Sequence, residues 1–455
     1  MADYNIKIYN LSPIWIQNIL TTVQGNIYRK QRFGSFYHSY LKELKERDYS
    51  NITAQRQYQD QEFVRLLHYA VKNSPFYKEY YNSCDLKSIK GVKDIGKLPI
   101  LTKETVRSNI DNLYTINPTD GVISNTSGTT GTSMKFIYTN EDLQKRMAYL
   151  DHFKAQHGFI ANKMKRASFN SSKIIPTNQK SNIFWRDNWS IKQRIYSGYH
   201  CKDKNLPFYV KNLNRYQPES IDGYPSALYE ISRFIIENKI GLSFTPIAIF
   251  PTAETLLPHY KKTIEEAFGC PVRDQYASSE GAPFITECEF GKLHYNLDTG
   301  IIEVDKDGEM LVTCFQTYGT PLIRYRIGDR VVMDEVNKIC ECGSSHPIVR
   351  GIEGRGIDYL VSKSKGRFTA IYLSLVSEDF LNSVKRMQFI QNSVDEIQVL
   401  LEVDKTYKKE MNQIILNKLQ YSFGNDMKFN LQLVHEIPRE SSGKYRLIIN
   451  NMDKK

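Results

Sequence analysis

The chain has 455 residues, of which 41% are hydrophobic and 24% are charged. These proportions are ordinary for a globular protein, and the length predicts two or three domains rather than one. The sequence has no apolar run long enough for a transmembrane helix, and its N-terminus lacks the pattern of a secretory signal. Seven scattered cysteines favour reduced thiols over a disulfide framework. We therefore expect a cytoplasmic protein without an integral membrane segment.

The chain is basic, with 61 Lys and Arg against 50 Asp and Glu, a net charge of +11. Such a balance is compatible with nucleic acid, with an anionic membrane surface or with phosphate-bearing small molecules. The lysines are scattered rather than clustered, which favours a solvated basic surface and no nucleic-acid partner. A membrane-surface role or a nucleotide role remains the alternative.

Secondary structure in the first third of the chain is predicted from apolar spacing and end signals. Residues 60–81 have helical spacing, and the sequence NSPFY is expected to end this helix because a residue before proline avoids the helical region. Residues 134–138 are predicted to be extended. Thr139 and Asp142 then form a pair that resembles a capping box, which predicts a helix start.

Helices and strands continue to alternate further along the chain. We predict helices over residues 226–239 and 261–268, a strand in IAIFPTAE (247–254) and a hairpin in IIEVDKDGEMLVT (301–313). This alternation predicts an α/β fold with mostly parallel sheets. Beyond about residue 355 the pattern restarts, with strands in DEIQVLLEVD and KFNLQLVHEI around a helix over 407–421. We therefore expect a large N-terminal domain, 1–354, and a small α+β C-terminal domain, 355–455.

The stretch SNTSGTTGTSMKF (124–136) is the first candidate for chemistry. Backbone N–H groups of a glycine-rich turn can bind an anion, and Ser and Thr hydroxyls add donors. It is not a Walker A sequence, and taken alone it is more typical of a plain turn than of a site. Three later segments give it a context: DQYASSEGA (274–282), YGTPLIRYRIGDR (318–330) and PRESSGKYRL (438–447).

In this order, the four segments resemble the core motifs of the adenylate-forming ligases, the acyl- and aryl-CoA synthetase superfamily. YASSE, TPLIRYRIGD and VRLLHYAVKNSPFYKEYY are similar to the phenylacetate-CoA ligase-like branch. IQNILTTVQGNIYRKQRFG (16–34) and IDGYPSALYEIS (221–232) resemble the CapK-type proteins associated with capsular polysaccharide synthesis. The resemblance covers nearly the whole chain, and it implies that the C-terminal domain is mobile.

The resemblance implies ATP and Mg²⁺ as cofactors and gives individual residues a role. The loop residues Ser127, Gly128, Thr129, Thr130, Gly131 and Thr132 would hold the β- and γ-phosphates, and Ala253 and Glu254 would line the adenine pocket, where Tyr276 would pack against adenine. Glu280 would hold Mg²⁺, Asp329 would accept hydrogen bonds from the ribose, Arg355 would lie beside the ribose, and Lys444 would bridge the attacking carboxylate and the α-phosphate. Singly, each residue is explained as well by core packing or solvation; the ordered set favours a site.

Two positions depart from the pattern of the superfamily. The phosphate loop is followed by Ser133-Met134-Lys135 instead of a Pro-Lys or Lys-Pro pair, which leaves the role of Lys135 open. The first acid of the hinge is replaced by Ile357, so the swing of the C-terminal domain is expected to be altered, with Gly356 as a source of flexibility. For the acid pocket, Phe136, Tyr138, Tyr224 and Pro225 are candidates, with core packing as the alternative.

A second candidate site is a group of cysteines and a histidine. Cys288 and His294 lie in ECEFGKLHY, and Cys340 and Cys342 lie in ICECGSSH. Three thiolates and one imidazole suit a structural, tetrahedral zinc ion, whereas inert buried cysteines are the alternative.

The sequence thus predicts ATP-dependent activation of a carboxylic acid as an acyl-adenylate. The acyl group would then pass to coenzyme A or to an amine acceptor, in capsular or surface polysaccharide biosynthesis. Two other functions stay open: a non-catalytic scaffold in polysaccharide assembly, and a nucleotidyltransferase that adenylylates a cofactor or protein. The identity of the acid and the oligomeric state are also left open.

Overall fold

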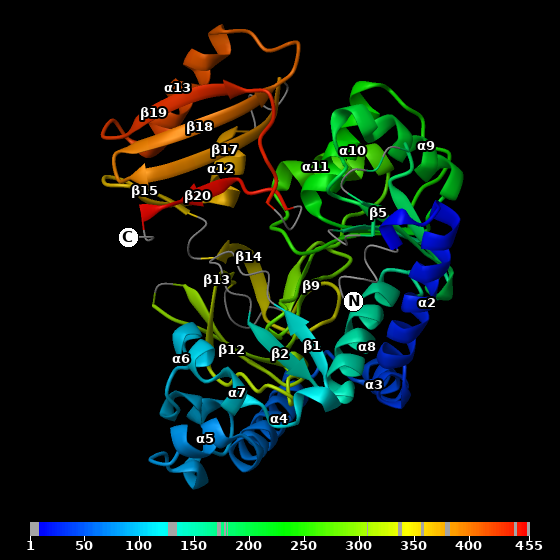
Figure 1. Ribbon diagram of the computed structural model, residues 1–455. Helices are drawn as coiled ribbons and strands as arrows, with labels where there is room; N and C mark the ends of the chain where they lie inside the picture. The colour runs from blue at the N-terminus through cyan, green and yellow to red at the C-terminus, as the bar shows by residue number, and fades with distance from the viewer. Residues whose placement is uncertain are drawn as a thin grey trace.

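The computed structural model describes residues 9–125, 134–170, 174–176, 179, 181–306, 308–334, 339–355, 359–377, 383–440 and 444–452. We call the described residues up to 355 the N-terminal region and those from 359 the C-terminal region. In Figure 1 the C-terminal region lies at the upper left, above the N-terminal region.

Helices dominate the first 160 residues. They are α2 (Ile14–Arg32), α3 (Ser35–Glu46), α4 (Ile52–Asn73), α5 (Pro75–Tyr80), α6 (Lys103–Ser108), α7 (Ile110–Leu113) and α8 (Asn140–Gln156). The prediction of one helix over 60–81 is wrong at its end, because Ser74 leaves the helical conformation and caps a new helix. Pro75 is the first residue of that helix, where its missing N–H costs nothing. The end of α4 at Asn73 agrees with the break predicted at NSPFY.

The serine- and threonine-rich stretch 124–136 connects two short antiparallel strands, β1 (Val122–Asn125) and β2 (Lys135–Tyr138). The extended conformation predicted before Thr139 is therefore confirmed. The capping box is confirmed too: Asp142 N–H donates to Thr139 Oγ1 at 3.0 Å, and Thr139 N–H donates to Asp142 Oδ2 at 2.9 Å.

A five-stranded sheet occupies the middle of the chain, in the order β4-β5-β3-β6-β7. Its strands are β3 (Arg166–Asn170), β4 (Trp185–Asn188), β5 (Gln193–Ser197), β6 (Ser220–Gly223) and β7 (Ala248–Pro251), and α9 (Leu206–Tyr216), α10 (Pro225–Glu237) and α11 (Pro258–Phe268) follow strands of it. All neighbours are parallel except β4 and β5. Gly269 ends α11 with a φ of 64°, a conformation that favours glycine. The helices and the strand predicted between residues 226 and 268 are confirmed.

A seven-stranded sheet follows, in the order β11-β12-β13-β14-β10-β9-β8. Its strands are β8 (Gln275–Tyr276), β9 (Ile285–Glu287), β10 (Leu293–Tyr295), β11 (Gly300–Val304), β12 (Glu309–Cys314), β13 (Tyr325–Met333) and β14 (Ile348–Arg355). The hairpin predicted over 301–313 is the pair β11–β12. Every neighbouring pair in this sheet is antiparallel, so mostly parallel pairing describes the five-stranded sheet and not this one.

The C-terminal region has a core of its own, which includes Leu360, Phe389, Val399 and Leu419. Its elements are β15 (Tyr359–Ser362), β16 (Gly366–Thr369), α12 (Ala370–Ser377), β17 (Val384–Ser393), β18 (Glu396–Val403), α13 (Glu410–Phe423), β19 (Lys428–Val434) and β20 (Ile448–Asn450). A four-stranded sheet has the order β19-β18-β17-β20. The strands and the helix predicted here are confirmed, and so is the mixed α/β fold class.

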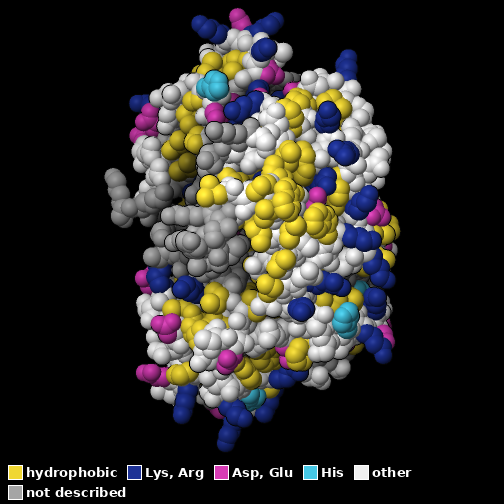
Figure 2. Space-filling model, turned by 45° about the vertical axis from the view of Figure 1, so that its right-hand side comes forward, with side chains coloured by type: hydrophobic (Ala, Val, Ile, Leu, Met, Phe, Trp, Pro, Cys, Tyr) yellow, Lys and Arg dark blue, Asp and Glu magenta, His cyan; other side chains and the backbone are white. Residues whose placement is uncertain are grey.

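The surface is not uniformly polar. In Figure 2 hydrophobic side chains gather on one face of the molecule. None of the described helices is both long enough and apolar enough to span a membrane.

Candidate active site

A cavity of about 580 Å³ lies between the two regions and is lined by residues from both. Ala253 and Glu254, which follow the parallel strand β7, form part of its wall. The ends of parallel strands commonly border ligand sites in α/β folds. The lining also contains Tyr276, Glu280, Asp329 and Lys444. The residues predicted to bind the nucleotide or to act in catalysis, where their side chains are described, thus all line one cavity.

Tyr276 and Asp329 face each other within the seven-stranded sheet. The Tyr276 hydroxyl donates a hydrogen bond of 2.6 Å to Asp329 Oδ2, which fixes the orientation of that carboxylate. Gly328, just before Asp329, has a φ of 88° that favours glycine. Asp329 in β13 is the register partner of Arg355, the last residue of β14. Only the backbone of Arg355 is described.

Glu280 lies in a tight turn that the end of the phosphate-loop hairpin helps to hold. Gly281 N–H donates to the Ser278 carbonyl at 3.2 Å, and the Tyr138 hydroxyl of β2 donates to the Ser279 carbonyl at 3.0 Å. Glu280 is 7% exposed. The strands that flank the predicted phosphate loop are therefore bonded to the turn of Glu280. The loop residues themselves, Ser127 to Thr132, lie outside the described part of the chain.

Ala253 and Glu254 form a strained corner of the cavity. Ala253 has a φ of 68°, a left-handed conformation that is uncommon for a residue with a Cβ and often occurs at functional sites. The Glu254 carboxylate accepts hydrogen bonds from Ser226 N–H at 3.0 Å, Ser226 Oγ at 3.1 Å and Tyr445 N–H at 3.0 Å. Burial raises the pKa of Glu254, whereas the nearby Arg439 opposes this shift. Glu254 thus connects α10 with the C-terminal region.

Lys444 is placed at the cavity by contacts of its neighbours. Its carbonyl accepts a hydrogen bond from Glu440 N–H at 2.9 Å, and Tyr445 N–H donates to Glu254. Arg439 Nη1 donates to Ser226 Oγ at 3.0 Å. One contact before Lys444, from Arg439, and one after it, from Tyr445, therefore attach this segment to the N-terminal region.

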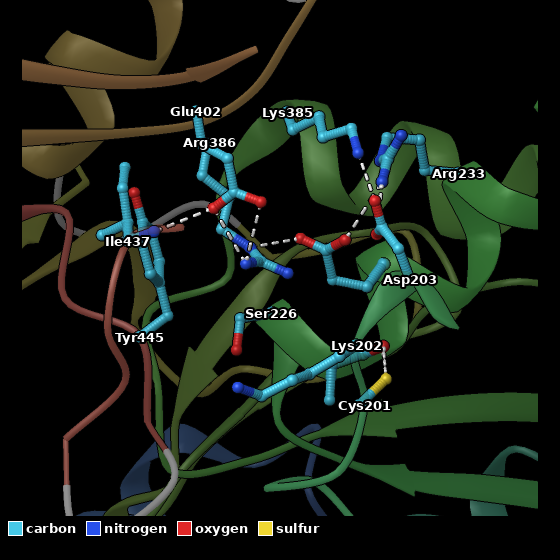
Figure 3. Close-up of polar contacts among 12 residues, drawn as sticks. Cys201, Lys202, Asp203, Ser226, Arg233, Lys385, Arg386, Glu402, Ile437 and Tyr445 are labelled. Atoms are coloured by element: carbon cyan, nitrogen blue, oxygen red, sulfur yellow. Dashed lines mark hydrogen bonds and ion pairs between the residues drawn. The ribbon is translucent and has the colours of Figure 1, made fainter. Parts of the chain in front are cut away.

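A network of charged side chains joins the two regions beside this segment (Figure 3). Arg386 in β17 donates to Glu230 in α10 at 2.7 Å and forms an ion pair with Glu402 at 3.1 Å. The Glu402 carboxylate also accepts a hydrogen bond from Ile437 N–H at 2.9 Å. Lys385 pairs with Asp203, and Lys202 pairs with Glu436 at 2.7 Å. Among the described residues, ion pairs of Arg386, Lys385 and Lys202 thus cross between the regions.

Several functional candidates were not found by sequence reasoning. Asp274 lines the cavity, and burial, reinforced by the charge of Glu287, raises its pKa to about 6. The only signal for it was its position at the start of DQYASSE. Arg386 and Glu230 carry no signal at all, because 156 residues separate them.

The residues proposed for an acid pocket are not in the described lining of the cavity. Phe136 packs in the core around α4 and the seven-stranded sheet, and Tyr224 packs in the core of the five-stranded sheet. Tyr138 is buried as well. The alternative of core packing is therefore the better description of these aromatic residues. Lys135 is exposed.

Cys288, His294, Cys340 and Cys342 form a second cluster of candidate site residues. Their ligand atoms all lie within 4.8 Å of one another. Cys288 Sγ is 3.9 Å from Cys340 Sγ, and Cys342 Sγ is 3.5 Å from His294 Nε2. The other ring nitrogen of His294, Nδ1, is 3.1 Å from the carbonyl of His346, which orients the ring. The two halves predicted from the sequence do come together.

Comparison with known proteins identifies the family. The chain is 41% identical to protein CapK of Staphylococcus aureus in an alignment of 454 positions that covers 98% of this chain and 99% of that protein. The chain belongs to the CapK family. The CapK C-terminal domain matches residues 360–451. The CapK-type resemblance of the sequence is thereby confirmed.

More distant similarities agree with the fold. Indoleacetate–lysine synthetase of Pseudomonas savastanoi is 24% identical in an alignment of 256 positions that covers 52% of this chain and 60% of that protein. 2-Hydroxyisobutyryl-CoA ligase in its postadenylation state, in complex with R3-HIB-AMP, matches with a TM-score of 0.73 at 16% identity, over 90% of this chain and 92% of that one. The same ligase, in complex with 2-HIB-AMP and CoA in its thioesterification state, matches with a TM-score of 0.55 at 17% identity. This match covers 89% of this chain and 91% of that one. The CapK-family chain therefore has the adenylate-forming ligase fold.

Proposed function

We propose that the protein activates a carboxylic acid with ATP, forming an acyl-adenylate and pyrophosphate. The observation that carries this proposal is the meeting of Lys444, Glu280, Asp329 and Tyr276 at one cavity between the two regions. The fold supports it, since the matched 2-hydroxyisobutyryl-CoA ligase is in complex with an AMP adduct.

In the proposed reaction, a carboxylate oxygen of the acid attacks the α-phosphorus of ATP, and the bond from that phosphorus to the pyrophosphate oxygen breaks. Charge grows on phosphate oxygens, so positioning and fixed donors are the main sources of catalysis. The Lys444 ammonium group offsets this charge between acid and α-phosphate. Asp329, oriented by Tyr276, accepts hydrogen bonds from the ribose hydroxyls. Arg355 would lie beside the ribose, and the adenine would lie against Tyr276 and the wall at Ala253 and Glu254.

Glu280 is our candidate ligand for Mg²⁺, and the residues present fit the ion. A carboxylate that is 7% exposed and lines a cavity offers the hard oxygen ligand that Mg²⁺ prefers, while the phosphates of ATP would supply others. Bound there, the ion would neutralise charge on the β- and γ-phosphates. Loop residues Ser127 to Thr132, whose flanking strand is bonded to the turn of Glu280, would hold the same phosphates.

The second step transfers the acyl group to coenzyme A or to an amine. A thioester is supported by the matched CoA ligase, and an amide by the relative named indoleacetate–lysine synthetase. Membership of the CapK family supports a place in capsular or surface polysaccharide synthesis, for which an amine on a sugar would be a suitable acceptor.

The test of the first step is exchange of labelled pyrophosphate into ATP over a panel of aryl, fatty and amino acids. We expect one acid class to support exchange, Lys444→Ala to abolish it, and Lys428→Ala, at an exposed lysine of β19, to leave it unchanged. If folded protein binds ATP but no acid supports exchange, the proposal fails. With the active acid, mass spectrometry after addition of coenzyme A or an amine identifies the acceptor.

We also propose that Cys288, His294, Cys340 and Cys342 bind a structural zinc ion. Around tetrahedral zinc, neighbouring ligand atoms are about 3.5–3.8 Å apart. Two of the separations, 3.9 Å and 3.5 Å, are close to these values, and all the ligand atoms lie within 4.8 Å of one another. Four protein ligands fill the coordination sphere, which is typical of structural rather than catalytic zinc. Zinc would tie β9 and β10 to the segment before β14.

Metal analysis of purified protein tests the zinc proposal. We expect about one zinc per chain, lost in Cys340→Ser and kept in Cys84→Ser, whose cysteine is half-buried outside the cluster. A zinc-free wild-type protein that takes up no added zinc would contradict the proposal.

A further inference from the structure

Helix α2 has an unusual distribution of side chains. Its buried residues are Gln17, Thr21 and Gly25, which lie four residues apart on one face. Arg186 of β4 donates to Gln17 Oε1 at 2.6 Å, and Asp187 N–H donates to Asn18 Oδ1 at 3.0 Å. A Cβ on Gly25 would come within 2.2 Å of Asn188, so glycine permits the close approach. The helix is thus attached to the protein mainly through polar groups.

The opposite face of α2 is apolar and exposed. Trp15, Ile19, Val23 and Ile27 recur every fourth residue, and Leu20 lies beside them; we call these five residues the α2 stripe. Trp15 is 64% exposed, and Leu11, just before the helix, is 87% exposed. Helix α2 lies on the right in Figure 1, the side that comes forward in Figure 2, where hydrophobic side chains gather. An amphipathic helix normally turns this face toward a core, so this stripe is suited to a partner.

The surface around the stripe extends beyond the helix. Trp189, 58% exposed, is in a short 3-10 helix (Trp189–Ile191) whose first N–H donates to Thr22 of α2 at 3.2 Å. Two of the chain's three tryptophans are therefore exposed on helix α2 or on the short helix bonded to it. Tryptophan is the side chain most typical of the boundary between water and lipid.

The charge of the α2 segment is of one sign. Residues 9–34 contain three basic side chains, Arg29, Lys30 and Arg32, and no Asp or Glu. Arg29 and Lys30 are exposed at the end of the helix that carries the stripe, and Lys192, also exposed, follows Trp189 in the chain. The nearest acidic residue of β4, Asp187, is paired with Arg194 at 2.6 Å.

We propose that the α2 stripe docks the protein on an anionic lipid surface, with the helix lying in the plane of the interface. Apolar residues with tryptophan on one face and basic residues beside them are the features of helices that bind there. A second copy of the chain is a poorer occupant. A twofold interface would bring together two basic α2 segments, neither of which contains an acid to offset the charge of the other.

The test uses full-length protein and sedimentation with vesicles of phosphatidylglycerol and phosphatidylcholine in equal amounts. We expect binding that weakens in high salt, and a blue shift of tryptophan emission. Trp15→Ser/Ile19→Ser should lower the partition coefficient about tenfold or more, and Arg29→Ser/Lys30→Ser should lower it on anionic vesicles. Tyr421→Ser, at an 87% exposed tyrosine of α13, is the matched control and should bind as wild type does.

Circular dichroism confirms that each variant folds, since all the substituted side chains are exposed. Absence of binding to anionic vesicles, or binding that Trp15→Ser/Ile19→Ser leaves unchanged, overturns the proposal. So does equal binding to phosphatidylcholine alone, which removes the role of charge. A protein that is dimeric in solution and becomes monomeric in Trp15→Ser/Ile19→Ser assigns the stripe to a second copy instead.

Discussion

Arg386 and Glu230 form a buried hydrogen-bonded ion pair of 2.7 Å across the two regions of the chain. Burial alone would lower the pKa of Arg386, but the charges of Glu230 and Glu402 raise it above its ordinary value. Burial likewise opposes ionisation of Glu230, but Arg386 and Arg233 keep the pKa of Glu230 below its ordinary value. Both side chains are therefore charged in this arrangement, and each depends on the other.

Removing one partner of this pair should separate the two regions. In Arg386→Met, Glu230 and Glu402 lose their shared cation, and leaving a buried charge without its partner costs about 3–5 kcal/mol. Because the regions can move apart and hydrate these carboxylates, we expect a larger radius of gyration in X-ray scattering and at least about tenfold slower pyrophosphate exchange.

The control for this experiment is Arg107→Met, whose exposed pair with Glu104 lies within one helix. It should leave both measurements unchanged. An Arg386→Met protein with wild-type scattering and wild-type exchange would show that the pair does not hold the regions together.

The hydroxyl of Tyr276 should matter for nucleotide affinity more than for turnover. The substitution Tyr276→Phe removes the 2.6 Å hydrogen bond that orients Asp329. It leaves the aromatic ring in place beside the cavity. A hydrogen bond to a charged group contributes about 1.5–3 kcal/mol, so we expect KM for ATP to rise about tenfold or more with little change in kcat. Tyr421→Phe serves as the control. An unchanged KM would mean that Asp329 is positioned by other contacts.

Asp274 should make stability depend on pH in a predictable direction. Its pKa is about 6 in the folded protein, mainly because of burial, and close to 4 when unfolded. A raised carboxyl pKa adds stability that is fully present below the unfolded pKa and is lost as the pH rises through about 6. Asp274→Asn removes this dependence. Wild type should therefore lose about 2 kcal/mol more than the variant between about pH 4 and about pH 7.

Urea unfolding at the two pH values measures this difference. Asp111→Asn, at an exposed aspartate, should follow wild type at both. If Asp274→Asn also follows wild type, the carboxyl group does not titrate in this range.

Loss of zinc should destabilise the seven-stranded sheet. The proposed ligands connect β9 and β10 with the segment before β14, so chelation removes a cross-link that exists only in the folded chain. We expect a strong chelator to lower the melting temperature by about 5 °C or more. Cys342→Ser should melt at the lower temperature and be insensitive to chelator. If wild type has the same melting temperature with and without chelator, the cluster does not stabilise the fold through a metal ion.

Local signals in the sequence were sufficient for many elements. The Thr139–Asp142 capping box marks a helix start through contacts within a few residues, and the helix predicted over 261–268 does end before Gly269. The cluster of Cys288, His294, Cys340 and Cys342 was predicted because its ligand chemistry is distinctive, although two halves about 45 residues apart had to meet. Contacts that depend on the meeting of two regions had no such signal, as Arg386 and Glu230 show.

Sheet topology was predicted less well for a related reason. Alternating helices and strands indicate parallel pairing, and this holds around β6, where helices lie between the strands. From β8 onward no described α-helix intervenes up to β14, so no helical crossover favours parallel pairing, and the strands pair antiparallel. At residue 75, a proline that ends one helix also begins the next, and sequence rules alone do not choose between these roles.

The contact of Glu254 with the segment of Lys444 is made to the backbone N–H of Tyr445. Every amino acid except proline supplies that donor, so this hydrogen bond imposes almost no constraint on the identity of residue 445. It constrains the path of the chain instead. Substitutions can accumulate at position 445 without moving the preceding lysine through loss of this bond, whereas a single proline there would remove the anchor while leaving Lys444 itself intact.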